Sequence, residues 1–174
     1  MAELMVVVLI IGMAAYVVSI SVDAILPGER LNSSVRSLGG ILQGTRSDAI
    51  ARNIELWVEY DLEEERYRIV TPFRAGGGSL IVSDEDDDQR VKLPWNTLEQ
   101  GVEIASVVTA GVEYTDGQVF VRFDPLGMAS DHSVILTQPA FENFFTIEVL
   151  ALTGLIRFHD GVFIREAPDD SDFN

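Results

Sequence analysis

Residues 4–22 read LMVVVLIIGMAAYVVSISV and contain no charged side chain. A helix rises about 1.5 Å per residue, so this segment would cover roughly 28 Å, which is close to the thickness of the hydrocarbon core of a bilayer. Lipid offers no partners to open backbone groups, so a helix is the favoured structure. No basic residue precedes the segment, which disfavours a cleaved secretory signal. The sequence therefore predicts a retained transmembrane helix rather than a core helix, because a small domain rarely encloses a helix that is apolar on every face.

Two features flank this apolar segment. Glu3 lies at its edge, where a carboxylate is either an interfacial residue favoured by the helix dipole or an assembly contact with a positive group of a neighbouring subunit. Pro27-Gly28 follows the segment and is expected to bend or interrupt the helix. We therefore assign residues 1–28 to a transmembrane helix segment.

The next segment has the period of an amphipathic helix. Apolar or small residues recur in steps of four and three along one stripe, namely Leu31, Val35, Leu38, Leu42, Thr45 and Ala49. Gly39, Gly40 and Gly44 weaken this helix, and they either permit close packing or mark a loop between two shorter helices. Asn53 is a plausible stop, so the amphipathic helix is expected over residues 29–53.

After Asn53 the period changes to two, which predicts a β-rich domain over residues 54–174. Acidic residues alternate along the first strand, and a turn at residues 62–65 indicates a hairpin. The strands are expected at residues 54–60, 66–70, 79–82, 103–108, 118–123, 133–137, 145–150, 155–159 and 162–165. Asp116-Gly117 and Asp160-Gly161 are typical of tight turns, the second between two short strands. The expected fold is α+β, with the long helix packed on one antiparallel β domain.

The residues from Glu3 onward, ELMVVVLIIGMAAYVV, resemble the start of a mature type IV pilin or type II secretion pseudopilin. That superfamily has a glutamate just inside the N-terminus and small residues about two turns further on, which here would be Gly12, Ala14 and Ala15. The basic leader that ends in Gly, and the Phe after it, are missing. The sequence is therefore expected to begin a few residues inside the mature protein.

Three later segments resemble the GspH/FimT-type minor pseudopilins: RSDAIARN at residues 46–53, FDPLG at 123–127 and TIEVLALTGLIRF at 146–158. The resemblance implies a minor pseudopilin of a type II secretion pseudopilus, with a single-pass helix in the inner membrane and a periplasmic β domain. Its partners would be other pseudopilins or pilins in a filament, and a prepilin peptidase and N-terminal methylation are implied as well. The alternatives are a minor pilin of a type IV pilus and, from another class, a membrane-anchored enzyme or binding module.

The same resemblance assigns the site residues. Glu3 would be the assembly residue, and Gly12, Ala14 and Ala15 would let neighbouring helices pack closely. Catalytic, cofactor-binding and metal-binding residues are not expected.

Composition narrows the function further. The 174 residues include 12 Lys and Arg against 28 Asp and Glu, a formal net charge of −16, which disfavours nucleic acid as a partner. The sequence has no cysteine and only two histidines, so thiolate and multi-histidine metal sites are excluded. Asp131, His132 and Ser133 are adjacent and cannot converge as a catalytic triad, and both histidines are expected at the surface or a sheet edge. The acidic run at residues 84–88 is interpreted as a solvated loop rather than a calcium site.

Overall fold

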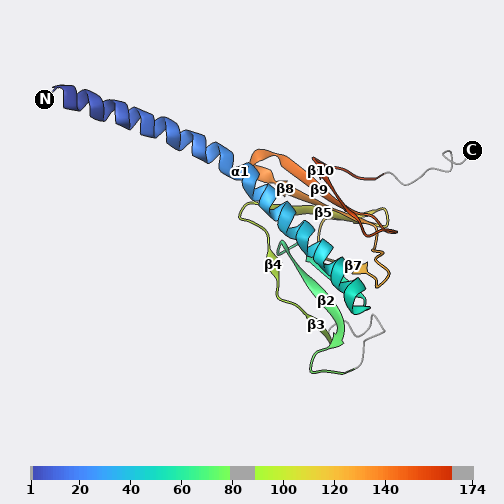
Figure 1. Cartoon of the computed structure of the whole chain (residues 1–174). Coiled ribbons are helices and arrows are strands. Elements are labelled where there is room, and N and C mark those ends of the chain that lie inside the picture. Colours follow the sequence, from blue (N-terminus) through green and yellow to red (C-terminus); the bar gives the residue numbers. More distant parts are fainter. Residues whose placement is uncertain (1, 79–88, 166–174) are drawn as a thin grey trace, which may run out of the picture.

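The computed structural model describes residues 2–78 and 89–165, including the helical side chains at residues 5–13 and 28–52. A long N-terminal helix packs on two antiparallel five-stranded sheets (Figure 1). The first sheet has the order β3 (Arg90–Lys92), β2 (Arg66–Arg74), β1 (Leu56–Asp61) and β7 (Gln118–Phe123), with β4 (Asn96–Thr97) also paired to β2. The second has the order β10 (Ile156–Asp160), β9 (Asn143–Val149), β8 (His132–Gln138), β5 (Glu103–Thr109) and β6 (Val112–Tyr114). A short 3₁₀ helix, η2 (Pro139–Phe141), joins β8 to β9.

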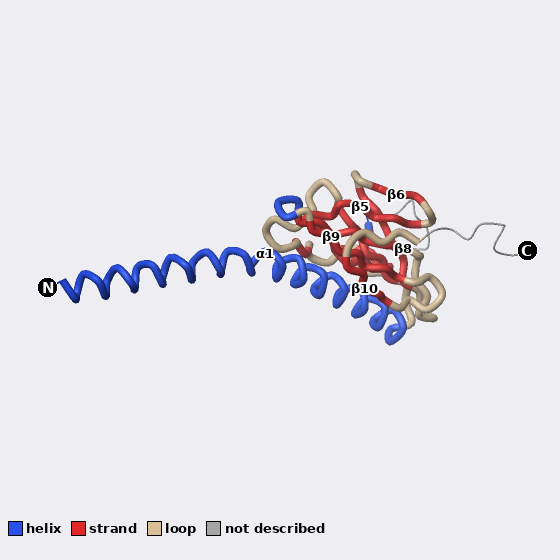
Figure 2. Tube along the Cα trace, turned by 90° about the horizontal axis from the view of Figure 1, so that it is seen from above, coloured by secondary structure: helices blue, strands red, loops and turns tan. Residues whose placement is uncertain are grey.

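The helix α1 (Ala2–Arg52) is continuous, so neither Pro27-Gly28 nor the later glycines interrupt it. Its axis changes direction where it reaches the strands, so the expected bend is present without a break (Figures 1 and 2). Asn53 ends the helix as predicted, with a φ of 53° in the left-handed region. The amide of Ile54 donates to the carbonyl of Ala49 at 3.1 Å, which satisfies one of the last carbonyls of the helix.

The second half of α1 contacts both sheets, along β1 and β7 of the first and β8, β9 and β10 of the second. All six residues of the predicted stripe are buried, with exposed fractions of at most 6%: Leu31, Val35, Leu38, Leu42, Thr45 and Ala49. Each buried leucine or valine contributes about 1.5–3 kcal/mol to stability. The apolar stripe therefore seals this half of the helix into the core of the β domain.

Close packing explains only one of the three glycines in this half. A Cβ on Gly39 would lie 2.6 Å from Cζ of Phe158 on β10, whereas a Cβ on Gly40 or Gly44 would meet no atom within 4 Å. Gly39 thus lets α1 approach the edge strand of the second sheet.

The predicted strands are confirmed for β1, β2, β5 and β7 to β10, with bounds that differ by a few residues. The strand predicted at residues 162–165 is wrong, and so is the hairpin at Asp160-Gly161. This segment bonds β9 through a side chain instead of a backbone ladder, because the amide of Phe163 donates to Oγ1 of Thr146 at 2.9 Å. The strand predicted at residues 79–82 and the acidic run at 84–88 lie outside the described residues.

The membrane prediction also falls partly outside what the structure describes, because the side chains of residues 4 and 14–22 are not included. Within the described residues, no helix is long and apolar enough to cross a membrane. The domain bounds at residues 28 and 53 stay predictions.

Candidate functional site

The predicted assembly residues lie on the half of α1 that projects away from the strands (Figure 2). Gly12 has described surroundings, and a Cβ there would meet no atom within 4 Å. Glu3, Ala14 and Ala15 belong to the helix, but their side chains lie outside the described residues. The apolar side chains around Gly12 have exposed fractions between 51% and 77%: Met5, Val6, Val7, Val8, Leu9, Ile10, Ile11 and Met13. An uncovered apolar surface of this kind is typical of an interaction site.

The three segments that resemble minor pseudopilins meet at the C-terminal end of α1. Nε of Arg46 donates to the carbonyl of Gly127, in the loop after β7, at 3.0 Å. A Cβ on Gly154, in the loop after β9, would lie 2.4 Å from that same carbonyl oxygen and 2.6 Å from Nε of Arg46. We call this arrangement of Arg46 with residues 124–129 and 150–155 the loop junction.

Glycine is required at the loop junction for two reasons. Gly154 has a φ of 57°, in the left-handed region, and it has no room for a side chain. The sequence does not predict that these three segments meet. The signals in the sequence that could have predicted this contact are two turns that contain glycine, at Gly127 and Gly154, and an arginine near the end of the helix, Arg46.

Hydrogen bonds fix both loops. Oδ1 of Asp124 accepts the amides of Leu126 at 2.8 Å and Met128 at 3.1 Å, as in an Asx-turn. The amide of Ala129 donates to the carbonyl of Ala151 at 2.9 Å, which ties one loop to the other. The loop junction is therefore a pre-organised part of the fold.

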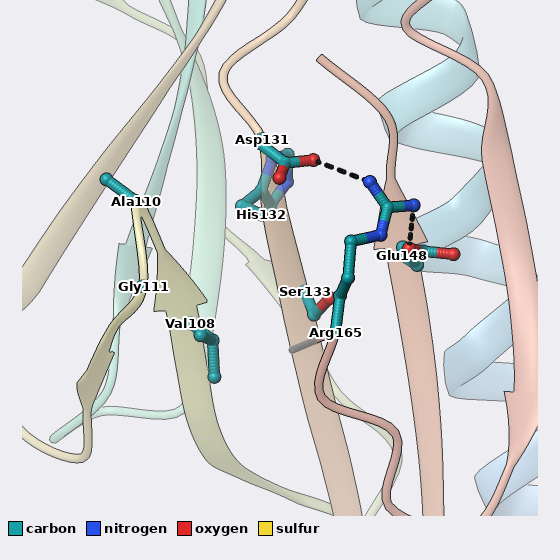
Figure 3. A pocket seen from close by; sticks show the side chains of 8 residues that line it. All are labelled: Val108, Ala110, Gly111, Asp131, His132, Ser133, Glu148 and Arg165. Carbon is teal, nitrogen blue, oxygen red and sulfur yellow. Dashed lines mark hydrogen bonds and ion pairs between the residues drawn. The ribbon is translucent and has the colours of Figure 1, made fainter. Parts of the chain in front are cut away.

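A small cavity of about 40 Å³ lies beside the start of β8, and Figure 3 shows Arg165 between two carboxylates there. Nη1 of Arg165 lies 3.8 Å from Oδ1 of Asp131, and Nη2 bonds Oε1 of Glu148. The side chain of Glu148 is 3% exposed, and its other oxygen lies 3.0 Å from Nε2 of His159. Both carboxylate oxygens of Glu148 are thus occupied, and the cluster is an ion-pair network that holds the C-terminal segment on β9.

His132 is buried, with 3% of its surface exposed, so the expectation that it lies at the surface is wrong. Its Nδ1 lies 2.8 Å from the carbonyl oxygen of Ser130, and its Nε2 lies 3.4 Å from Oη of Tyr60 in the first sheet. Side chains alternate along a strand, so Ser133 points to the opposite face from His132 and the two cannot act together. His159 lies on the edge strand β10, as predicted.

We expect the buried ring of His132 to make the protein sensitive to acid. Burial lowers the pKa of His132 from 6.5 to about 4, so the folded protein binds fewer protons than the unfolded chain between those values. This contribution to stability is complete above about pH 6.5 and is lost as the pH falls toward 4, by about 2 kcal/mol between pH 7.5 and pH 5.

The measurement is urea unfolding of the wild type and of His132→Gln at both pH values. The variant should lose about 2 kcal/mol less than the wild type over this interval, since only the wild type has the titrating ring. Equal losses would contradict the role of His132.

A larger groove of about 560 Å³ lies where α1 enters the β domain, beside Gly28 and Leu31. Its lining includes the apolar side chains of Phe144 and Phe145 and the carboxylates of Glu142 and Asp160. Among the described residues, no group of His, Asp and Glu side chains is arranged to hold a metal ion. The groove lies at the base of the projecting half of α1.

Comparisons with known proteins agree on one fold. The family model described as "Type II transport protein GspH" matches residues 34–152, which is more than half of the chain. The minor pseudopilin EpsH of the type II secretion system of Vibrio cholerae is similar in structure, with a TM-score of 0.56 and 13% identity, over 79% of this chain and 98% of that chain. A second EpsH structure gives a TM-score of 0.53 and 14% identity, over 75% and 97% of the two chains.

The type IV minor pilin FimU of Pseudomonas aeruginosa is less similar, with a TM-score of 0.46 and 13% identity over 74% of this chain and 91% of that chain. No curated protein matches in sequence. The structural matches show the fold alone, and the family model is what indicates the kind of protein.

Proposed function

Because the chain belongs to the GspH family of type II transport proteins, we propose that it is a minor pseudopilin that assembles through the N-terminal half of α1 into a type II secretion pseudopilus. The observation that carries the proposal is the division of one continuous helix into two halves. One half is sealed into the β domain by its apolar stripe, and the other projects with its described apolar side chains exposed. Exposed apolar surface of this kind is unfavourable in water, and packing against the same helices of other subunits can bury it.

Before assembly, in this proposal, the inner membrane surrounds the projecting half of α1 and the β domain lies in the periplasm. The absence of charge from residues 4–22 supports this location. A prepilin peptidase and N-terminal methylation belong to the same proposal and rest on the resemblance of the N-terminal residues.

In the filament, the projecting helices would bundle together. Gly12, Ala14 and Ala15 supply small side chains, which let helix backbones approach closely. The proposed role is structural, because the buried Glu148 and His132 are paired and present no free group for acid–base chemistry.

Glu3 provides the test of assembly. A carboxylate removed from water among apolar helices costs several kcal/mol unless a cation pairs with it, and the terminal amine of a neighbouring subunit is the proposed partner. Glu3→Leu should therefore reduce co-purification with the other pseudopilins at least tenfold while membrane insertion and folding of the β domain are unchanged.

Glu29→Leu is the matched control, because it removes a carboxylate from an exposed part of the same helix and should assemble normally. Equal recovery of Glu3→Leu and wild type would contradict the assembly role of Glu3. Co-purification with the subunits of a type IV pilus, instead of those of a secretion system, would favour the alternative of a minor pilin.

A further inference from the structure

We propose that the loop junction is a docking surface for the globular domain of a second pilin-like subunit, one that brings apolar side chains onto Leu126 and Leu152 and a carboxylate to Arg46. This inference rests on the proposed function and extends it, because it concerns contacts between globular domains and not between N-terminal helices.

The first observation is the exposure of leucine side chains on the two loops. Leu126 is 83% exposed and Leu152 is 84% exposed, which are the two highest exposed fractions among the large apolar side chains described. Ile50 lies beside the first of these loops, since its Cδ1 would be 3.2 Å from a Cβ on Gly127, and it is 42% exposed. Exposed apolar groups on two loops that are bonded to each other favour a protein contact over open water.

The second observation is that the loops are held in place before any partner arrives. Leu126 donates its amide to Asp124, and the neighbouring Gly127 accepts from Arg46. In the other loop, Gly154 donates its amide to the carbonyl of Leu150 at 2.7 Å. A surface that is already ordered loses little conformational freedom when it binds, so its apolar side chains contribute more of their burial to affinity.

The third observation is the charge of this surface. Arg46 is half-buried and uses Nε on Gly127, while its Nη1 and Nη2 have no hydrogen-bond or ion-pair partner among residues 2–78 and 89–165. The single carboxylate of the two loops, Asp124, already accepts two amides. In a chain of net charge −16, the loop junction therefore favours a partner that supplies a carboxylate.

The fourth observation gives the direction of the contact. The C-terminal end of α1, where Arg46 and Ile50 lie, is on the opposite side of the β domain from the N-terminus (Figures 1 and 2). In the proposed function the N-terminus lies on the membrane side, so the loop junction points away from the membrane and toward any subunit further along the filament. A second copy of this chain across a two-fold axis fits less well, because it would place Arg46 opposite Arg46.

The experiment is site-specific photo-cross-linking in cells that produce the full chain with its own set of pilin-like subunits. p-Benzoylphenylalanine replaces Leu126 in one sample and Val8 on the projecting helix, which is 64% exposed, in another. Phe120 is the control, because it is 39% exposed on the outward-facing side of β7. Mass spectrometry identifies the linked peptides.

We expect position 126 to link to the globular domain of a different pilin-like subunit, and position 120 not to link to that subunit. Links from position 126 to residues 166–174 of the same chain, or to a second copy of this chain, would overturn the inference. Links from position 8 without links from position 126 would do so too, while leaving the proposed function intact. If neither position links to a pilin-like subunit, both proposals fail.

A binding measurement complements the cross-links. The double variant L126S/L152S should recover at least tenfold less of the linked subunit by co-purification, and Phe120→Ser should recover the wild-type amount. Both variants replace exposed side chains, so their unfolding midpoints should match the wild type. Undiminished recovery by the double variant would overturn the docking surface.

Discussion

Replacing Arg68 by methionine is expected to lower the free energy of unfolding by about 3–5 kcal/mol. Glu59 lies opposite Arg68 on the neighbouring strand, and its side chain is fully buried. Arg68 donates to both carboxylate oxygens of Glu59, from Nε to Oε2 at 2.7 Å and from Nη2 to Oε1 at 2.9 Å. Methionine would leave the buried Glu59 with the more distant partner Lys92, whose Nζ is 3.9 Å from Oε2. A buried charge that loses its partner is among the most destabilising single changes.

Urea unfolding of the full chain in detergent, followed by far-UV circular dichroism, measures this effect. Arg52→Met is the control, because its ion pair with Asp48 spans 3.8 Å between side chains that are 67% and 56% exposed. That variant should lose no more than about 0.5 kcal/mol. Adding Glu59→Met to the Arg68 variant should restore part of the stability, since an apolar pair leaves no buried charge. Equal losses in the two single variants would contradict this explanation.

Gly154→Ala is expected to lower the free energy of unfolding by about 2–4 kcal/mol, because it combines backbone strain with a clash against backbone. The φ of Gly154 is 57°, and the new Cβ would lie 2.4 Å from the carbonyl oxygen of Gly127. That carbonyl is fixed by Arg46, so the loop cannot move away without losing this hydrogen bond.

Gly117→Ala separates the two causes. Gly117 has a φ of 75°, and a Cβ there would meet no atom within 4 Å, so only the backbone strain applies. Its loss should be about 1–2 kcal/mol, in the same urea measurement. If Gly154→Ala lost no more than Gly117→Ala, the close approach at the loop junction would not be what requires glycine.

The periodicity of apolar residues predicted the helix and the longer strands, because these elements are decided by residues close together in the sequence. The helix stripe was confirmed at all six positions, because a period of 3.6 residues over about five turns leaves little ambiguity. The strands β3, β4 and β6 were missed, because each has only two or three residues and cannot show an alternation. Residues 162–165, Val-Phe-Ile-Arg, have the β-branched and aromatic composition of a strand, yet the amide of Phe163 bonds the side chain of Thr146 instead of a neighbouring backbone.

Long-range contacts limited the prediction of sites. His132 is buried because Tyr60 and Phe123 come from the other sheet, with ring centroids 6.1 Å and 6.3 Å away. No signal adjacent to His132 in the sequence reports those neighbours. The loop junction likewise unites segments about 80 residues apart, such as Arg46 and Gly127. Glu3, Gly12, Ala14 and Ala15 came from a resemblance of residues near the N-terminus, and their roles stay predictions.

The continuity of α1 has a mechanical consequence. A force that pulls on the N-terminus passes through one continuous helix into the β domain. The buried stripe lies lengthwise along both sheets, so the load is shared in shear by all six residues from Leu31 to Ala49 instead of peeling them one at a time. At its far end the helix continues through residues 53–55 into β1, an inner strand of the first sheet. Force applied to the helix is therefore passed to the core of the β domain instead of to a loop or an edge strand.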